Sequence, residues 1–209
     1  ITNFPSVRPA WGELIRNAQF IKIVDGETVL ISNGFAPTFG AAWDSNPYAQ
    51  QWSLVDGEPP TNKKEVVMDV VTAENHNFSV GDRVTVLAGA TPASFTIVGI
   101  AEFANVGAPG GATFALFEFR TAQALLDSKG EVDLINVVIE NNFDINDVKN
   151  DITNLDSENL NVINAQEAAA EQADSIKQGL DFFNTILNVF AGIAIFVGAF
   201  IIQNTFRIL

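Results

Sequence analysis

Short stretches of alternating hydrophobic and polar positions occupy most of the chain, and one long apolar stretch lies near its C-terminal end. Asp25-Gly26 separates two of the short stretches, which predicts a β-hairpin. The expected strands are residues 19–24, 28–31, 65–69, 83–87, 94–100 and 113–119. Because Gly and Pro punctuate them at short intervals, they predict a β-rich lobe over about residues 50–120, a small antiparallel barrel or sandwich. Residues 33–47 are expected to form a loop.

A second pattern follows at about residues 130–164. Residues 132–139 alternate as a strand, and Asp144 is a good N-cap for a helix. The apolar residues that recur at helical spacing behind this cap are Ile145, Val148, Ile152 and Leu155. Residues 160–163 are expected to form another strand. This β-α-β lobe, next to the β-rich lobe, predicts an α+β fold.

The last helix is the longest element that the pattern predicts. Asn164 as N-cap and Glu167 three residues later resemble a capping box, and no proline interrupts the chain from there to Leu209. A continuous helix from about Ala165 to Phe206 would be roughly 65 Å long at 1.5 Å per residue. We expect an extracytoplasmic domain over residues 1–164, a stalk over 165–186 and a transmembrane helix over 187–209.

The membrane prediction depends on the charge pattern. Between Asp181 and Arg207 lie 25 residues without a charge, and a bilayer core of ~30 Å needs roughly 20 mostly apolar residues. A buried core helix is the alternative, but such helices seldom run this long without a charge.

Charge also predicts the orientation of the chain. Residues 1–181 carry 25 Asp and Glu against ten Lys and Arg, whereas Arg207 is the only charge after the apolar run. Since cationic flanks stay in the cytoplasm, residues 1 to about 181 should be extracytoplasmic.

Amino-acid composition limits the classes of partner that the chain can bind. A pI near 4.2 argues against nucleic acid as a partner, because phosphates need a basic surface. Membrane lipid is the partner that the apolar run predicts. The chain begins at Ile1 and stops just past that run, so we expect a piece of a longer protein.

The sequence predicts no catalytic, cofactor-binding or metal-binding residue, and therefore no enzyme. The chain has no Cys, and its one His, His76, cannot build a zinc site alone. Residues 107–111 lack the Lys-Ser or Lys-Thr of a phosphate loop. Residues 144–149 start like a calcium loop but place Lys149 where Gly is required. Ala194 and Gly198 permit close helix approach, with ordinary glycine usage equally compatible.

The chain resembles a known family over about residues 50–209. The residues that carry the likeness are 56–60, 65–69, Thr72-Ala73-Glu74, 78–86, 95–100 and 190–209. They look like the extracytoplasmic domain and following membrane helix of FtsX/MacB-type ABC transporter permeases. The resemblance implies a multi-pass cell-membrane protein, a dimer of permeases and a cytoplasmic ABC ATPase subunit or domain. It also implies export of lipoprotein, peptide or drug, or action on a cell-wall partner.

Two other functions remain open at this point. One is a C-terminally anchored, single-pass surface protein that binds a ligand or partner. The other is a membrane-tethered enzyme, which the missing catalytic set disfavours. A stiff helix between domain and membrane follows from the sequence pattern itself, whereas its coupling to ATP follows only from the resemblance.

Overall fold

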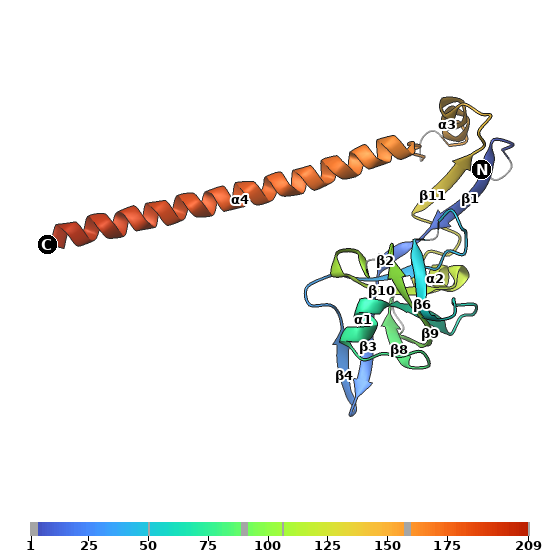
Figure 1. Ribbon diagram of the computed structural model, residues 1–209, viewed down its shortest axis with the longest axis horizontal. Coiled ribbons are helices and arrows are strands. Elements are labelled where there is room, and N and C mark those ends of the chain that lie inside the picture. The colour runs from blue at the N-terminus through green and yellow to red at the C-terminus, as the bar shows by residue number, and fades with distance from the viewer. Residues whose placement is uncertain (1–3, 50, 89–91, 106, 157–159, 209) are drawn as a thin grey trace. The chain divides into compact units, whose positions relative to one another are not determined.

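The computed structural model describes residues 4–49, 51–88, 92–105, 107–156 and 160–208 (Figure 1). The chain divides into two compact units, Ile1–Val138 and Ile139–Leu209. The first holds a curled β-sheet with short helices, and most of the second is one long helix. This arrangement confirms the predicted α+β class.

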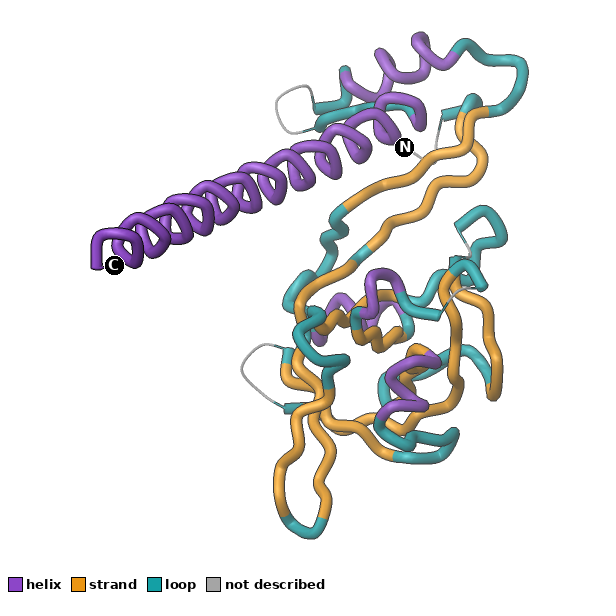
Figure 2. The backbone as a smooth tube through the Cα atoms, turned by 60° about the vertical axis from the view of Figure 1, so that its left-hand side comes forward, coloured by secondary structure: helices purple, strands orange, loops and turns teal. Residues whose placement is uncertain are grey.

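A nine-stranded sheet forms most of the first unit. Its strands are β2 (Ile15–Asn17), β3 (Gln19–Val24), β4 (Glu27–Ile31), β5 (Thr38–Ala42), β6 (Trp52–Gly57), β7 (Glu65–Asp69), β8 (Arg83–Leu87), β9 (Ala93–Phe103) and β10 (Thr113–Phe117). Their order is β2-β5-β10-β7-β9-β8-β3-β4, and β6 also pairs with β9. A separate two-stranded sheet joins β1 (Val7–Glu13) to β11 (Leu134–Ile139), whose strands run side by side in Figure 2. The predicted hairpin around Asp25-Gly26 is confirmed as β3 and β4.

The sheet is mixed, so the expected antiparallel barrel or sandwich is wrong. β5 pairs with β10 in parallel, and so does β7 with β9. β5 lies in the segment that was expected to be a loop. Gly40 lies within this strand, and glycine in the sequence is more typical of a loop. In the structure, a Cβ at position 40 would lie 3.0 Å from Leu126 Cδ2 and 3.3 Å from Ala18 Cβ. Close packing therefore requires the glycine in this strand.

The core of the first unit lies between the sheet and two short helices. α1 (Val70–Asn75) and α2 (Phe119–Leu125) contribute Ala73 and Ala122 to it. The largest side chains in this core include Phe20, Ile31, Met68, Ile97 and Phe117, each with no exposed surface. A short 3₁₀ turn, η1 (Pro109–Gly111), leads into β10. Among the described residues, this core contains none from the C-terminal helix.

The second unit contains α3 (Ile145–Thr153) and α4 (Ala165–Ile208). Asp144 caps α3 as predicted, because its side chain accepts a hydrogen bond from Asn146 N. The strand predicted at residues 160–163 is wrong: a strand needs a hydrogen-bonded neighbour, and Leu160 N instead donates to Asp156 O at 3.0 Å. α4 is unbroken over 44 residues, which confirms the predicted continuity and gives a length of about 66 Å.

Asp69 joins three elements of the first unit. The side chain is fully buried, and its two oxygens accept hydrogen bonds from Thr72 N at 2.8 Å and Phe114 N at 2.7 Å. It thereby caps α1 and ties the end of β7 to β10. Burial raises the pKa of Asp69, and the hydrogen bonds from Phe114 and Thr72 oppose that rise.

We predict that Asp69→Ala lowers the free energy of unfolding by about 2–5 kcal/mol, because two buried N–H groups lose their acceptors. Asp69→Asn keeps one acceptor oxygen and should lose about half as much. Urea unfolding followed by tryptophan fluorescence measures the effect, since all three tryptophans lie in the first unit.

The control for this prediction is Asp82→Ala. The Asp82 side chain is exposed and accepts a hydrogen bond from Ser79 N, so its removal should cost no more than about 1 kcal/mol. Equal losses for Asp69→Ala and Asp82→Ala would contradict the role given to Asp69.

Candidate functional site

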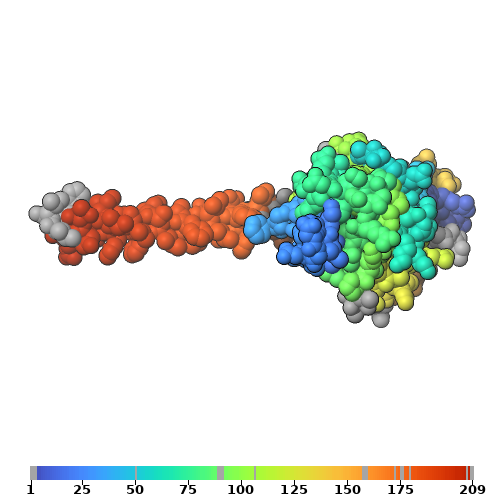
Figure 3. Space-filling model, turned by 90° about the horizontal axis from the view of Figure 1, so that it is seen from below, coloured from blue at the N-terminus to red at the C-terminus, as the bar shows by residue number. Residues whose placement is uncertain are grey.

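The C-terminal part of α4 exposes apolar side chains. Residues Leu180–Thr205 form a helical segment long and apolar enough to cross a membrane, and none of it is buried. Figure 3 shows the side chains along one face of α4. Ile195 and Phe196 are about three-quarters exposed, at 73% and 74%. Since a helix satisfies its own backbone hydrogen bonds, lipid can cover this surface at no polar cost.

Two side chains, those of Asn164 and Glu167, cap the N-terminal end of α4. Asn164 Oδ1 accepts hydrogen bonds from Gln166 N and Glu167 N, each at 2.9 Å. In return, Glu167 Oε2 accepts one from Asn164 N at 2.9 Å. This is the reciprocal arrangement of a capping box, and it confirms the prediction from Asn164 and Glu167.

An ion pair joins the same cap to α3. Lys149 Nζ lies 2.9 Å from Glu167 Oε1 and 2.7 Å from Glu167 Oε2. The hydrogen bond from the Lys149 ammonium, together with that from Asn164 N, lowers the pKa of Glu167. The sequence did not predict this contact, because the two residues lie on different helices. Glu167 thus holds both the start of α4 and its neighbour α3.

The residues that the sequence analysis weighed as zinc, phosphate or calcium sites have structural roles. His76 is the C-cap of α1, and its Nε2 lies 3.1 Å from Ser32 O. Residues 107–111 include η1 and lead into β10. Residues 144–149 are the cap and first turn of α3. A Cβ at Gly198 would meet nothing within 4 Å, so close helix approach there stays a prediction.

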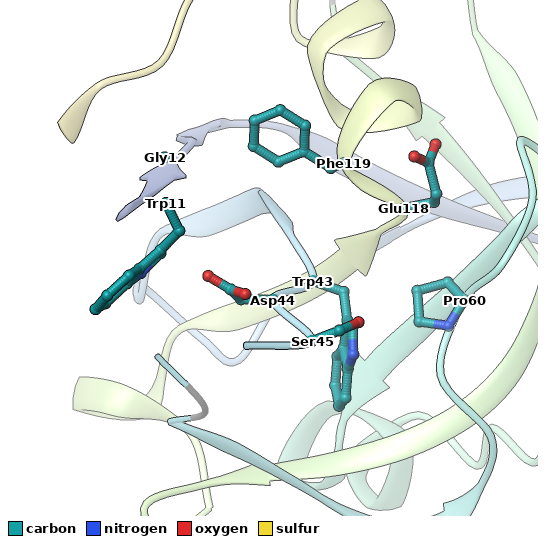
Figure 4. A pocket seen from close by; sticks show the side chains of 8 residues that line it. All are labelled: Trp11, Gly12, Trp43, Asp44, Ser45, Pro60, Glu118 and Phe119. Atoms are coloured by element: carbon teal, nitrogen blue, oxygen red, sulfur yellow. The ribbon is translucent and has the colours of Figure 1, made fainter. Parts of the chain in front are cut away.

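The first unit also contains a hollow that the sequence analysis missed. It has a volume of about 380 Å³, and its wall includes Trp11, Trp43, Asp44 and Phe119 (Figure 4). A second hollow, of about 260 Å³, includes Asp44, Trp52, Phe103 and Phe114 in its wall. Asp44 belongs to both.

Strand pairing explains why these distant residues meet. β5 and β10 are parallel with Ala42 opposite Phe117, so the residues just after each strand lie at the same edge of the sheet. Trp43 N donates to Phe117 O at 2.7 Å, which extends the pairing by one step. β2 runs antiparallel to β5, with Ile15 opposite Ala41, and this brings the end of β1 alongside Trp43 and Asp44. The signal in the sequence was that all three tryptophans lie within the first 52 residues.

Comparison with known proteins gives consistent matches. Residues 3–155 match the MacB-like periplasmic core domain. A protein of Mycobacterium tuberculosis described as an uncharacterized ABC transporter permease is 26% identical over 146 residues, which are 69% of this chain and 16% of that protein. This chain thus spans about a sixth of that relative.

Two solved structures share the fold. The periplasmic region of MacB from Actinobacillus actinomycetemcomitans superposes with a TM-score of 0.52 at 14% identity, over 86% of this chain and 78% of that one. The extracellular domain of the noncanonic ABC-type transporter YknZ from Gram-positive bacteria gives 0.53 at 12% identity, over 76% and 79%.

The fold and the exposed apolar helix define the class of protein: a membrane protein with an α+β domain outside the lipid. The family match is more specific, since it covers well over half of the chain. The chain belongs to the MacB-like periplasmic core domain family. This confirms the resemblance to FtsX/MacB-type permeases.

We predict that Lys149→Ala raises the pKa of Glu167 toward the ordinary range of a glutamate, because it removes the cation that favours the carboxylate. NMR titration of the Glu167 side-chain carboxyl carbon measures the shift. Lys177→Ala is the control: Lys177 is ten residues further along α4, about 15 Å, and should leave the pKa unchanged. An unchanged pKa in Lys149→Ala would show that the ion pair does not form in solution.

Proposed function

We propose that this chain is the outer domain and lever of an ABC transporter permease. In this proposal α4 carries motion between a membrane segment and the extracytoplasmic domain. A cytoplasmic ABC ATPase subunit or domain hydrolyses ATP and drives the motion. The output is export of a lipoprotein, peptide or drug, or control of a cell-wall partner, and two permeases act as a dimer in the cell membrane.

The observation that carries the proposal is the continuity of α4. The helix runs without a break from Ala165 to Ile208, and its apolar part begins at Leu180. The candidate span of 26 residues is about 39 Å long, longer than the bilayer core of ~30 Å. We propose that residues 165–186 form the stalk, that residues 187–209 form the transmembrane helix and that residues 1 to about 181 are extracytoplasmic. Leu209 lies outside the described residues.

The capped start of α4 supports the same role. A helix that transmits motion must be fixed at its end. At the N-terminal end of α4, Glu167 accepts hydrogen bonds from Asn164 N and from the Lys149 side chain on α3. The capping box and the ion pair therefore act against fraying of the first turn. A passive anchor has no need of this fixed start, since it only has to stay in the membrane.

An alternative function is a C-terminally anchored, single-pass surface protein. The exposed apolar helix fits it equally well. The similarity to the Mycobacterium tuberculosis protein favours the permease, because that protein is described as an ABC transporter permease.

We predict that Ile176→Pro in the full-length permease abolishes export or partner activation while membrane insertion stays intact. Proline removes a helix hydrogen bond and clashes with the preceding turn, at about 3 kcal/mol. The apolar residues from Leu187 onward are unchanged, so insertion should not suffer. Protease protection of the inserted segment and ATP-dependent activity are measured on the same vesicles.

The matched control is Ile176→Ala, which shortens the same side chain but favours the helix. It should keep most of the activity. Full activity of a correctly inserted Ile176→Pro protein would rule out the lever and favour the plain anchor.

A further inference from the structure

The geometry points to a binding site for a small organic ammonium ion in the two hollows that share Asp44. The ligand class is an amine or quaternary amine with a compact apolar body. This role differs from that of a lever, because it concerns the outer domain alone and does not depend on α4.

The carboxylate of Asp44 is the recognition element. Asp44 Oδ1 accepts a hydrogen bond from Asn46 N at 2.7 Å, which fixes the side chain at the start of a turn. Within the described part of the chain, no Lys or Arg forms an ion pair with Asp44. The side chain is half-buried, so its charge is only partly screened by water and is available to a cation from outside.

Aromatic side chains line the same hollow as this carboxylate. Figure 4 shows the Asp44 carboxylate on the side of the Trp11 indole, with the ring of Phe119 at another edge of the hollow and the indole of Trp43 extending away from Asp44. Trp43 is 8% exposed, and the packed sheet holds it in place. The face of an aromatic ring attracts a cation through its quadrupole, most strongly for Trp, and aromatic cages beside a carboxylate suit ammonium groups.

A second acidic residue, Glu118, also lies in the wall of the first hollow. Its Oε1 and Oε2 accept hydrogen bonds from Arg120 N and Thr121 N at the start of α2. Although burial opposes it, these bonds and the nearby Arg120 cation lower the pKa of Glu118. Because Glu118 is engaged in this way, Asp44 is the carboxylate that the proposal assigns to a ligand cation.

The second hollow provides the apolar part of the site. Trp52 packs against Phe103 and Phe114 with ring centroids 5.4 and 5.2 Å apart. These rings and neighbouring aliphatic side chains form most of its wall. The first hollow alone, at about 380 Å³, reaches the size of sites that hold small molecules, roughly 300–1,000 Å³. An ammonium group beside Asp44 can thus place its apolar body against Trp52.

The test uses phenethylammonium as the probe, with 2-phenylethanol and 3-phenylpropionate as neutral and anionic analogues. The full 209-residue chain is reconstituted in phosphatidylcholine vesicles, and its tryptophan fluorescence is followed. All three tryptophans line the two hollows, so the signal reports on the site itself. We expect saturable binding of phenethylammonium, at least about tenfold tighter than the alcohol, because a charge-assisted contact is added. The carboxylate analogue should not bind.

Substitutions locate the site. Asp44→Asn can still accept from Asn46 N but loses the charge, and it should weaken phenethylammonium about tenfold, to the level of the alcohol. Phe119→Leu should weaken the ammonium about two- to fivefold and leave the alcohol unchanged. Asp56→Asn is the matched control: Asp56 is exposed on β6, accepts from Gly57 N and lies in neither wall. It removes the same charge and should leave binding unchanged.

Three results would overturn the proposal: equal affinity for the alcohol and the ammonium, full affinity in Asp44→Asn, or equal weakening by Asp44→Asn and Asp56→Asn. The last would mean that the ammonium follows only the net negative charge of the chain.

Discussion

The exposed apolar surface of α4 requires an apolar cover, and this requirement constrains the rest of the chain. Among the described residues, none of the segment Leu180–Thr205 is buried, so in water large apolar groups would be exposed along about 39 Å of helix. The residues before it cannot enter a bilayer, because they carry 24 of the 25 acidic side chains. The acidic part of the chain therefore requires water, and the apolar part requires an apolar environment. α4 includes residues of both parts.

This division explains why the first unit folds around its own core. The sheet, α1 and α2 bury Phe20, Met68 and Phe117 without using α4, and Asp69 ties β7, α1 and β10 together by buried hydrogen bonds. α4 is in turn fixed by Asn164, Glu167 and Lys149 within the second unit. A rigid outer domain and a capped helix are the two parts that the proposed lever needs.

The sequence predicted the features that depend on neighbouring residues. Asp25-Gly26 encodes its hairpin locally, and the uncharged run and the Asn164 cap encode α4. The sequence could not predict the parallel pairing of β5 with β10, because that pairing depends on distant residues and Gly40 makes β5 look like a loop. The hollow around Asp44 was missed for the same reason: Trp43 and Phe119 meet through that pairing, and the pairing of β2 with β5 adds Trp11. Only the concentration of tryptophan near the N-terminal end gave a hint.

The central claim is that α4 stays one stiff helix between the outer domain and the membrane while the transporter works. Spin labels can be placed at Ala169→Cys and Asn184→Cys, two exposed positions of α4. These 209 residues have no Cys of their own, and any cysteine elsewhere in the permease is first replaced by serine. Double electron–electron resonance then measures the distance between the two labels in the full-length permease in lipid vesicles, with and without ATP. A stiff helix predicts one narrow distribution near 22 Å between the backbone positions in both states. A broad distribution, or a distance that shortens with ATP, would contradict the claim.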